Sequence, residues 1–470
     1  MNYKFSELRF KDSFKVKEKE EKSLDSLRLS HYPDNAFKLF PYKASGKSQA
    51  PIVYDMEEII SGFFRKALDL ETEDIDEESL CQRLISNIDI DAEDLEYFQD
   101  LISNLFFRGG DFIAENIGLY PYQTNVQNKS ADRVAFFMSC VMGVGDADRK
   151  IIKGAINKYP YNVLEKMVID SIESKQLKRG KEKPYYPIIT NVQEKFKKDF
   201  YFMLDTGMTS LEDLSNLLAL YYFYYVSQTC ITLDQFGMGK REDPIPLYFA
   251  LDWERVNKNR LCCVEGWENL QAKINHMFSH AITLEIINQH DDINLMCDYI
   301  DLQNYVKANE SRDEFVASEI KSAEHAYTSC VGDYKKFDEI PYAEGGSKTD
   351  KALRHLFKCV EEQFLNTDRK RANQFYNEKF SDFCKERWVK NRKKSGLVLN
   401  LTERDIIFLT KISLRDKDRI RLIDLYKEYE YRGIYLDNTS KELLQEFFTK
   451  LNLIDKKSDS GDAQYVKRIL

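Results

Sequence analysis

The chain has 470 residues, of which 43% are hydrophobic and 31% are charged, and its net charge is −9. This length allows two or three domains that each bury a core, and this apolar content excludes wholesale disorder. The nine cysteines are an odd number and contain no Cys-x-x-Cys pair, which excludes a disulfide scaffold and a zinc ribbon. We therefore expect reduced thiols in a cytoplasmic protein.

The N-terminal residues 1–22 are rich in Lys, Glu and Asp and lack an apolar core of signal-peptide length. The most apolar run, Leu217–Val226, is too short to span a bilayer and follows the helix-capping residues Thr209 and Ser210. We interpret this run as a buried helix and expect no membrane partner.

Most of the chain is expected to be α-helical, since glycine and proline are sparse and no extended sheet can be placed. Amphipathic patterns predict helices at Met56–Leu70, Asp94–Phe106, Leu211–Gln228, Glu268–Asn288, Arg312–Tyr327 and Lys351–Leu365. Breaks rich in glycine or proline favour four regions. These are an N-terminal helical region (1–180), a central helical region (181–345), a basic helical connector (346–401) and a C-terminal unit (402–470).

Two segments stand apart in charge. Residues 71–100 hold twelve Asp and Glu against one Arg, which is typical of a solvated helix face or loop. The alternatives are an acidic contact to a basic partner and a surface that keeps this end of the molecule away from DNA. Residues 366–400 hold ten basic and four acidic residues, and the basic ones gather at Arg369-Lys370-Arg371 and Arg392-Lys393-Lys394. Aromatic residues between them either form the core face of a helix or accompany a DNA contact.

Three helices are expected in the C-terminal unit. Thr402 is expected to cap the first helix, and Asp405, three residues later, is expected to complete the capping box. The second covers Asp418–Tyr431 and ends at Gly433. The turn Asp437–Ser440 caps the third, whose inward face comprises Leu443, Leu444, Phe447, Phe448 and Leu451.

Two strands follow these helices, Leu453–Lys456 and Gln464–Ile469, with a polar turn at residues 458–462 between them. Three helices followed by a hairpin are the order of a winged helix-turn-helix domain, which binds duplex DNA or docks proteins. Since this unit contains its own caps and core, a fragment starting near Gly396 is expected to fold alone.

The charge of this unit leaves both functions open. Residues 402–470 hold fourteen basic and thirteen acidic residues, a low excess for a phosphate-binding surface. The third helix mixes Lys441 and Lys450 with glutamates, and the wing carries Lys456 and Lys457. The predicted DNA contacts are Arg369, Lys370, Arg371, Arg392, Lys393, Lys394, Lys441, Lys450, Lys456 and Lys457.

The possible catalytic motifs are incomplete. Gly46-Lys47-Ser48 resembles the end of a phosphate-binding loop, but the glycine required five residues earlier is Pro41. His276 and His280 lie one helical turn apart and, with His290 and Asp291, could form a metal-dependent hydrolase site. No glutamate stands between the first two histidines to act as a base, so a hydrogen-bonded histidine pair is favoured. We expect neither a catalytic residue nor a cofactor.

The C-terminal run Arg432-Gly433-Ile434-Tyr435-Leu436-Asp437, the helix Leu443–Phe448 and the segment Ser458–Val466 together resemble the DptG family. Its members are the G components of bacterial phosphorothioation-dependent DNA restriction systems. Leu39-Phe40-Pro41-Tyr42-Lys43 is similar to an early segment of that family. The resemblance implies a defence protein that works with an ATPase and a helicase-like partner on DNA lacking the sulfur modification. It transfers no catalytic residue.

From these observations we expect a mostly α-helical, non-catalytic subunit that ends in a winged helix and holds DNA or bridges its motor partners. Two alternatives remain. One is a metal-dependent hydrolase or nuclease that uses His276, His280, His290 and Asp291. The other is a winged helix that docks proteins only, which the nearly neutral charge of residues 402–470 allows.

Overall fold

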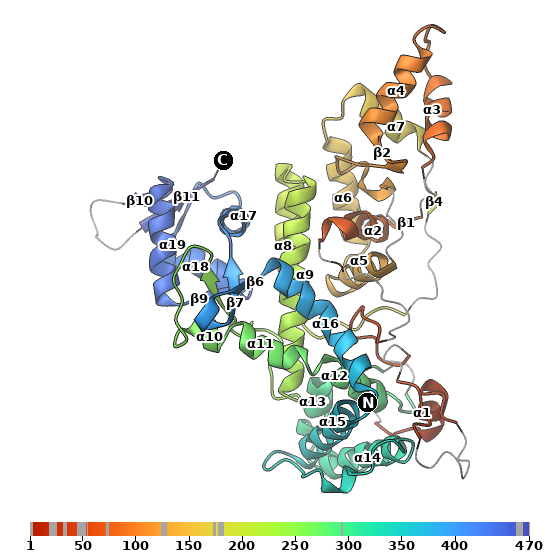
Figure 1. The fold of residues 1–470 in the computed structure, drawn as a ribbon, viewed down its shortest axis with the longest axis vertical. Coiled ribbons are helices and arrows are strands. Elements are labelled where there is room, and N and C mark those ends of the chain that lie inside the picture. Colours follow the sequence, from red (N-terminus) through yellow and green to blue (C-terminus); the bar gives the residue numbers. More distant parts are fainter. Residues whose placement is uncertain are drawn as a thin grey trace.

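The computed structural model describes residues 3–17, 26–31, 35–44, 53, 55–71, 75–123, 129–172, 175–176, 183–292, 295–456 and 464–469. Helices make up most of these residues and the strands are short, which confirms the expected mostly α-helical class. Figure 1 shows α3, α4 and α7 at one extremity, helices α12 to α15 at another, and the C-terminal elements beside the central helices α8 and α9.

The N-terminal elements pack mainly through α2 against α5. The helices are α1 (Glu7–Ser13), α2 (Glu57–Leu68), α3 (Glu77–Ile85), α4 (Leu95–Phe106), α5 (Lys129–Val141), α6 (Asp146–Lys158) and α7 (Val163–Ser171). Two small antiparallel pairs join β1 (Leu70–Glu71) to β4 (Lys175–Gln176), and β2 (Phe107–Arg108) to β3 (Asp111–Phe112). Helix α1 lies away from the others and contacts the central helix α14, so the region 1–180 is not one spatial unit.

Helix α9 (Leu211–Asp234) is the buried axis of the molecule and follows α8 (Val192–Thr206). Ser210 caps α9 by accepting a hydrogen bond from the Asp213 amide at 3.1 Å. All ten residues of Leu217–Val226 are buried on this helix, which confirms the interpretation of this apolar run.

The central and connector helices enclose the other side of α9. They are α10 (Leu261–Val264), α11 (Trp267–Ile274), α12 (Met277–Ile287), α13 (Tyr299–Lys307), α14 (Ser311–Thr328), α15 (Lys348–Asn366) and α16 (Lys370–Arg387). The helix expected over Glu268–Asn288 is in fact two helices. Asn377 of α16 occupies the break, where it donates to the Asn275 carbonyl at 2.7 Å and accepts from the Phe278 amide at 3.1 Å.

A four-stranded sheet joins segments far apart in sequence, in the order β6-β7-β5-β9. Its strands are β6 (Val389–Asn391), β7 (Leu397–Leu401), β5 (Tyr248–Leu251) and β9 (Tyr435–Leu436). The central strand β5 pairs in parallel with both β7 and β9, while β6 and β7 are antiparallel. The sheet therefore crosses the boundaries expected after residues 345 and 401.

The C-terminal unit contains α17 (Glu403–Leu414), β8 (Arg419–Arg421), α18 (Leu422–Tyr431), α19 (Asn438–Lys450), β10 (Ile454–Lys456) and β11 (Gln464–Lys467). The Thr402–Asp405 capping box is present. Strand β8 stands where the sequence predicted the start of the second helix, and β11 pairs with both β8 and β10. Leu451, expected to face inward, is 44% exposed.

A buried ion pair fastens this unit to the central helices. Arg432, at the end of α18, is bidentate to Asp199 of α8, with both N–O distances 2.7 Å and both side chains fully buried. Tyr221 of α9 donates to the same carboxylate at 2.7 Å, and Arg415 adds a second cation at 3.0 Å. Burial opposes ionisation of Asp199, but these partners outweigh it and hold the pKa of its carboxyl below the ordinary value.

Replacing Arg432 with Met should lower the free energy of unfolding by at least about 3 kcal/mol, since Asp199 would stay buried with its main partner removed. Arg404→Ala is the matched control, because Arg404 is 88% exposed and its ion pair with Glu212 is 4.0 Å long. Denaturant unfolding measures the free energy of unfolding of both variants. Equal, small effects of the two substitutions would contradict the assigned role of Arg432.

The fragment 396–470 should not fold alone, contrary to the sequence-based expectation. It would carry Arg432 without Asp199 and β9 without β5. An amide NMR spectrum of the fragment with narrow dispersion is the expected result. A well-dispersed spectrum would show that the contacts with α8 and β5 are dispensable.

Candidate nucleic-acid interface

The outer face of the sheet β10-β11-β8 carries basic and aromatic side chains. Ile420 and Val466 are buried, whereas their strand neighbours point to the opposite face of the sheet. That outer face therefore holds Arg419 and Arg421 of β8 with Tyr465 and Lys467 of β11. Arg419 pairs with Lys467 and Arg421 with Tyr465 across the strands.

Contacts within this face arrange its charges. The Arg419 guanidinium lies over the Tyr465 ring, 5.0 Å from the centroid, and contacts Asp455 of β10 at 3.2 Å. Arg421 donates to the Tyr465 hydroxyl at 3.4 Å, which raises the pKa of its guanidinium and keeps it charged. Arg419 and Lys467 lie directly opposite each other, and Asp455 offsets only part of their combined positive charge. This arrangement suits the phosphates of a nucleic acid.

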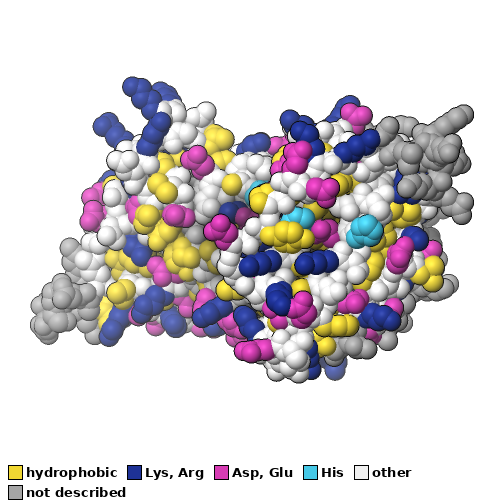
Figure 2. Space-filling view, turned by 90° about the horizontal axis from the view of Figure 1, so that it is seen from below, with side chains coloured by type: hydrophobic (Ala, Val, Ile, Leu, Met, Phe, Trp, Pro, Cys, Tyr) yellow, Lys and Arg dark blue, Asp and Glu magenta, His cyan; other side chains and the backbone are white. Residues whose placement is uncertain are grey.

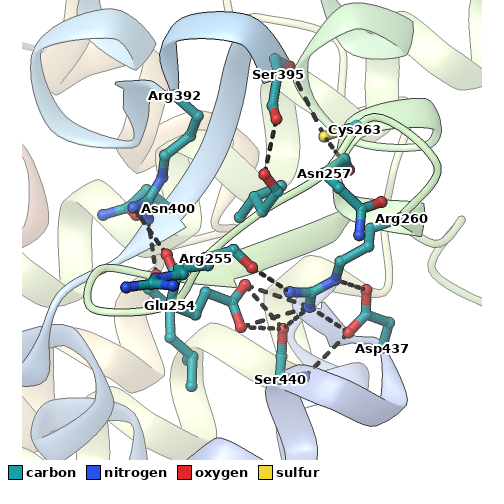
Figure 3. Close-up of polar contacts among 12 residues, drawn as sticks. Glu254, Arg255, Asn257, Arg260, Cys263, Arg392, Ser395, Asn400, Asp437 and Ser440 are labelled. Atoms are coloured by element: carbon teal, nitrogen blue, oxygen red, sulfur yellow. Dashed lines mark hydrogen bonds and ion pairs between the residues drawn. The ribbon is translucent and has the colours of Figure 1, made fainter.

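The N-terminal turn of the third helix, α19, is held against the loop that follows β5 (Figure 3). Arg260 donates to Asp437, the N-cap of α19, at 2.9 Å and to the Ser440 hydroxyl at 2.8 Å. Glu254, whose side chain is fully buried, accepts from Ser440 at 3.0 Å and faces Arg260 at 3.3 Å. Burial raises the pKa of Glu254, although Arg260 and Ser440 oppose this shift.

This network determines which part of α19 is open to a ligand. In winged helices that read DNA, the N-terminal residues of the third helix enter the major groove. Here Arg260 and Glu254 hold Asp437 and Ser440 of that turn, whereas Asn438 and Thr439 between them are exposed. Further along, Phe447 packs on Trp253 with ring centroids 4.8 Å apart. The exposed residues of α19 are polar and of mixed charge: Asn438, Thr439, Glu442, Glu446, Thr449 and Lys450.

The residues predicted to contact DNA are dispersed. Arg369, Lys370 and Arg371 are exposed at the start of α16, while the second basic group follows its other end. The helix has 18 residues, so its two ends are about 27 Å apart at 1.5 Å per residue. The aromatic residues between them form a core face, since Tyr376, Phe380, Phe383 and Trp388 are buried.

Arg392, in the second basic group, makes hydrogen bonds that stabilise the fold. Its guanidinium donates to the Leu251 carbonyl at 2.7 Å, the Asp252 carbonyl at 3.0 Å and the Asn400 side chain at 2.6 Å, so both of its terminal nitrogens already have protein partners (Figure 3). Its neighbours Lys393 and Lys394 are exposed.

On α19, Lys450 is exposed, whereas Lys441 is half-buried and pairs with Glu430 at 3.0 Å. The backbone of Lys456 ends β10, but its side chain and the whole of Lys457 lie outside the described residues. The signal that sequence reasoning missed is the alternation Arg419-Ile420-Arg421, which matches a strand with one buried face.

The face of the molecule that lies opposite α3 and α4 does not carry charges of a single sign. Figure 2 shows Lys and Arg side chains interspersed with Asp and Glu across this face, together with hydrophobic and histidine side chains. Such a mixture is ordinary for a solvated protein surface. It contrasts with the outer face of the C-terminal sheet, where basic side chains predominate among the described residues.

The structure assembles only part of the possible catalytic motifs among the described residues. Gly46-Lys47-Ser48 lies outside the described residues. His276 and His280 do lie together, but their shared partner is Asp234 of α9. His290 packs against Tyr3 instead, and Asp291 is exposed beside Lys4, so the four-residue cluster of the hydrolase alternative is not assembled.

No family model matches this chain, and no curated protein matches it. Among the described residues, none of the helices combines the length and apolar character needed to cross a bilayer.

Replacing Arg419, Arg421 and Lys467 together with Gln should weaken DNA binding equally for unrelated sequences. Each lost phosphate contact should reduce the slope of log K against log salt by about 0.9. The matched control replaces Lys150, Lys153 and Lys158, three exposed lysines of α6, and should leave the slope unchanged. Fluorescence anisotropy over a salt series measures both. An unchanged slope in the first variant would place the DNA contact elsewhere.

Proposed function

We propose that this protein is a non-catalytic subunit of a phosphorothioation-dependent DNA restriction complex, in which it holds DNA and bridges an ATPase and a helicase-like partner. The resemblance of Arg432–Asp437, Leu443–Phe448 and Ser458–Val466 to the DptG family supports this function. The nine cysteines are all free, which fits the cytoplasmic location that such a function requires.

The proposed C-terminal winged helix rests on the order and pairing of its elements. Along residues 403–467 the order is α17, β8, α18, α19, β10 and β11, with the two-residue strand β9 of the other sheet between α18 and α19. The last strand, β11, lies between the other two in an antiparallel sheet. This is the helix and strand order expected of a winged helix.

The observation that carries the DNA-holding role is the outer face formed by Arg419, Arg421, Tyr465 and Lys467. These side chains can contact phosphate through charge and a base or sugar through the tyrosine ring. The proposed contact is with the DNA backbone and is independent of sequence, because arginine and lysine side chains pair with phosphates whatever the bases are. Lys393 and Lys394 are further candidates for such contacts.

The bridging role is supported by the opposite extremity of the molecule. Tyr97, Leu101 and Leu105 lie one turn apart on α4 and are 76%, 43% and 46% exposed. Most carboxylates of the described part of segment 71–100 are exposed around this helix. An exposed apolar ridge within an acidic surface fits a protein partner that carries an apolar groove with basic edges.

The second candidate is a winged helix that docks only proteins. The mixed charge of the exposed side of α19 favours it, because Glu442 and Glu446 would repel phosphate. Salt dependence separates the two functions, since a protein dock would show neither DNA binding at moderate salt nor a slope that depends on Arg419, Arg421 and Lys467.

Replacing Tyr97, Leu101 and Leu105 together with Ser should reduce the recovery of the ATPase or helicase-like partner when the products of the neighbouring genes are co-expressed and purified with this chain. The substitutions remove the apolar contact and leave the buried residues of α4, Ile102 and Phe106, in place. Leu8→Ser, at a residue of α1 that is 71% exposed, is the control. Equal recovery of the partner with both variants would show that Tyr97, Leu101 and Leu105 do not contact it.

The purified protein alone should hydrolyse neither ATP nor DNA, with or without Mg²⁺, Mn²⁺ or Zn²⁺. Motor activity needs a complete phosphate-binding loop, and Pro41 replaces its first glycine. A coupled ATPase assay and a plasmid cleavage assay measure the two activities. Metal-dependent cleavage that His276→Gln abolishes would favour the hydrolase instead.

A further inference from the structure

A three-residue group joins the end of α9 to the start of α12. Asp234 is the last residue of α9, His276 precedes α12, and His280 follows one turn later. One Asp234 oxygen lies 2.7 Å from His276 Nδ1 and 3.2 Å from His280 Nε2. Each residue offers a ligand atom, and the three atoms lie within 4.8 Å of one another. Two imidazoles and a carboxylate are a common ligand set for zinc.

The other ring nitrogen of each histidine has a partner that fixes its orientation. His276 Nε2 faces Glu361 of α15 at 3.2 Å, and His280 Nδ1 faces the Tyr299 hydroxyl of α13 at 3.1 Å. Metal-binding histidines usually donate their second N–H to such an oxygen, which sets the tautomer and raises the basicity of the ligating nitrogen. Helices α9, α12, α13 and α15 therefore preorganise the group.

The group opens onto a cleft of about 740 Å³ that Asp234 and His276 line together with Phe236, Arg354 and Lys358. His280 closes the inner side, with its side chain only 1% exposed, while the His276 side chain is 31% exposed. Three protein ligands with one side open to a cleft leave a coordination position for water or an anionic group.

Asp234 has three basic partners, His276, His280 and Lys273. Lys273 is the competitor, since its ammonium lies 2.7 Å from the second Asp234 oxygen.

We propose that Asp234, His276 and His280 bind one divalent transition-metal ion of the zinc type, with Glu361 and Tyr299 as positioning residues. The nitrogen-rich ligand set disfavours Mg²⁺ and Ca²⁺, which prefer oxygen ligands. The proposal does not depend on the restriction function, and it replaces His290 and Asp291 of the sequence-based metal cluster with a residue from α9, more than 40 positions earlier in the chain.

A second group, Glu324, His355 and Cys359, is a weaker candidate. Glu324 and Cys359 approach the same His355 nitrogen at 2.7 Å and 3.7 Å, and burial raises the pKa of the Cys359 thiol. The Glu324 carboxylate raises the pKa of His355 despite burial, which favours a charged ion pair over a metal ligand. This group supplies the alternative outcome of the test.

The test is titration of the purified full-length protein with Co²⁺ alone, followed by competition with Zn²⁺. We expect about one Co²⁺ per chain, with visible d–d absorption and no thiolate-to-cobalt charge-transfer band, because the ligands are nitrogen and oxygen. His276→Gln should lower the affinity by at least about tenfold, and so should Glu361→Gln through the lost orientation of His276. Lys273→Met should raise the affinity, since it removes the competing cation.

His325→Gln, at an exposed histidine of α14, is the matched control and should bind as the wild type does. His276 is partly exposed, so its variant is expected to keep the fold, and thermal unfolding without metal checks this. Absence of binding to the wild type would overturn the proposal, as would affinities that His276→Gln and Lys273→Met leave unchanged. A charge-transfer band lost in Cys359→Ser would assign the metal to the second group instead.

Discussion

The contact between Arg432 and Asp199 fixes the position of the C-terminal unit. A guanidinium with no exposure to solvent is tolerated only where its donors have partners, and Asp199, Glu428 and the Ile412 carbonyl provide them. Lys195 of α8 adds to this contact between α8 and the C-terminal unit by donating to the Tyr431 carbonyl at 2.6 Å. Gly433 follows directly, with φ of +77° and no room for a side chain, because an added Cβ would meet the Tyr224 ring at 2.7 Å. These contacts with α8 and α9 set the orientation of α19 and of the C-terminal sheet.

Local signals in the sequence predicted much of the fold. The caps at Thr402, Ser210 and Asp437 and the apolar run of α9 depend on neighbours a few residues away, and the structure confirms them. The split of the helix expected over Glu268–Asn288 depends on Asn377, about 100 residues later, and no local pattern contains it. The sheet β6-β7-β5-β9 was missed for a similar reason, because its strands are short and pair across distant segments.

The candidate site shows the same limit. Composition identified basic residues but could not tell Arg392, which holds backbone carbonyls of the β5 loop, from Lys393 and Lys394, which are exposed. The basic outer face of β8 and β11 comes from residues more than 40 positions apart, brought together by register. Likewise, the helical spacing of His276 and His280 was visible in the sequence, but the third member of the group, Asp234, was identified only by the packing of α9 against α12.

The position of β5 at the centre of its sheet has a consequence for biosynthesis. Ala250 pairs with Asn400, and Tyr248 pairs with Tyr435, so each edge of β5 stays unpaired until its later partner has been synthesised. Contacts of such sequence separation slow folding, and N-terminal segments emerge from the ribosome first. A nascent chain halted before residue 435 therefore exposes the unpaired amides and carbonyls of β5, an edge on which other chains can aggregate.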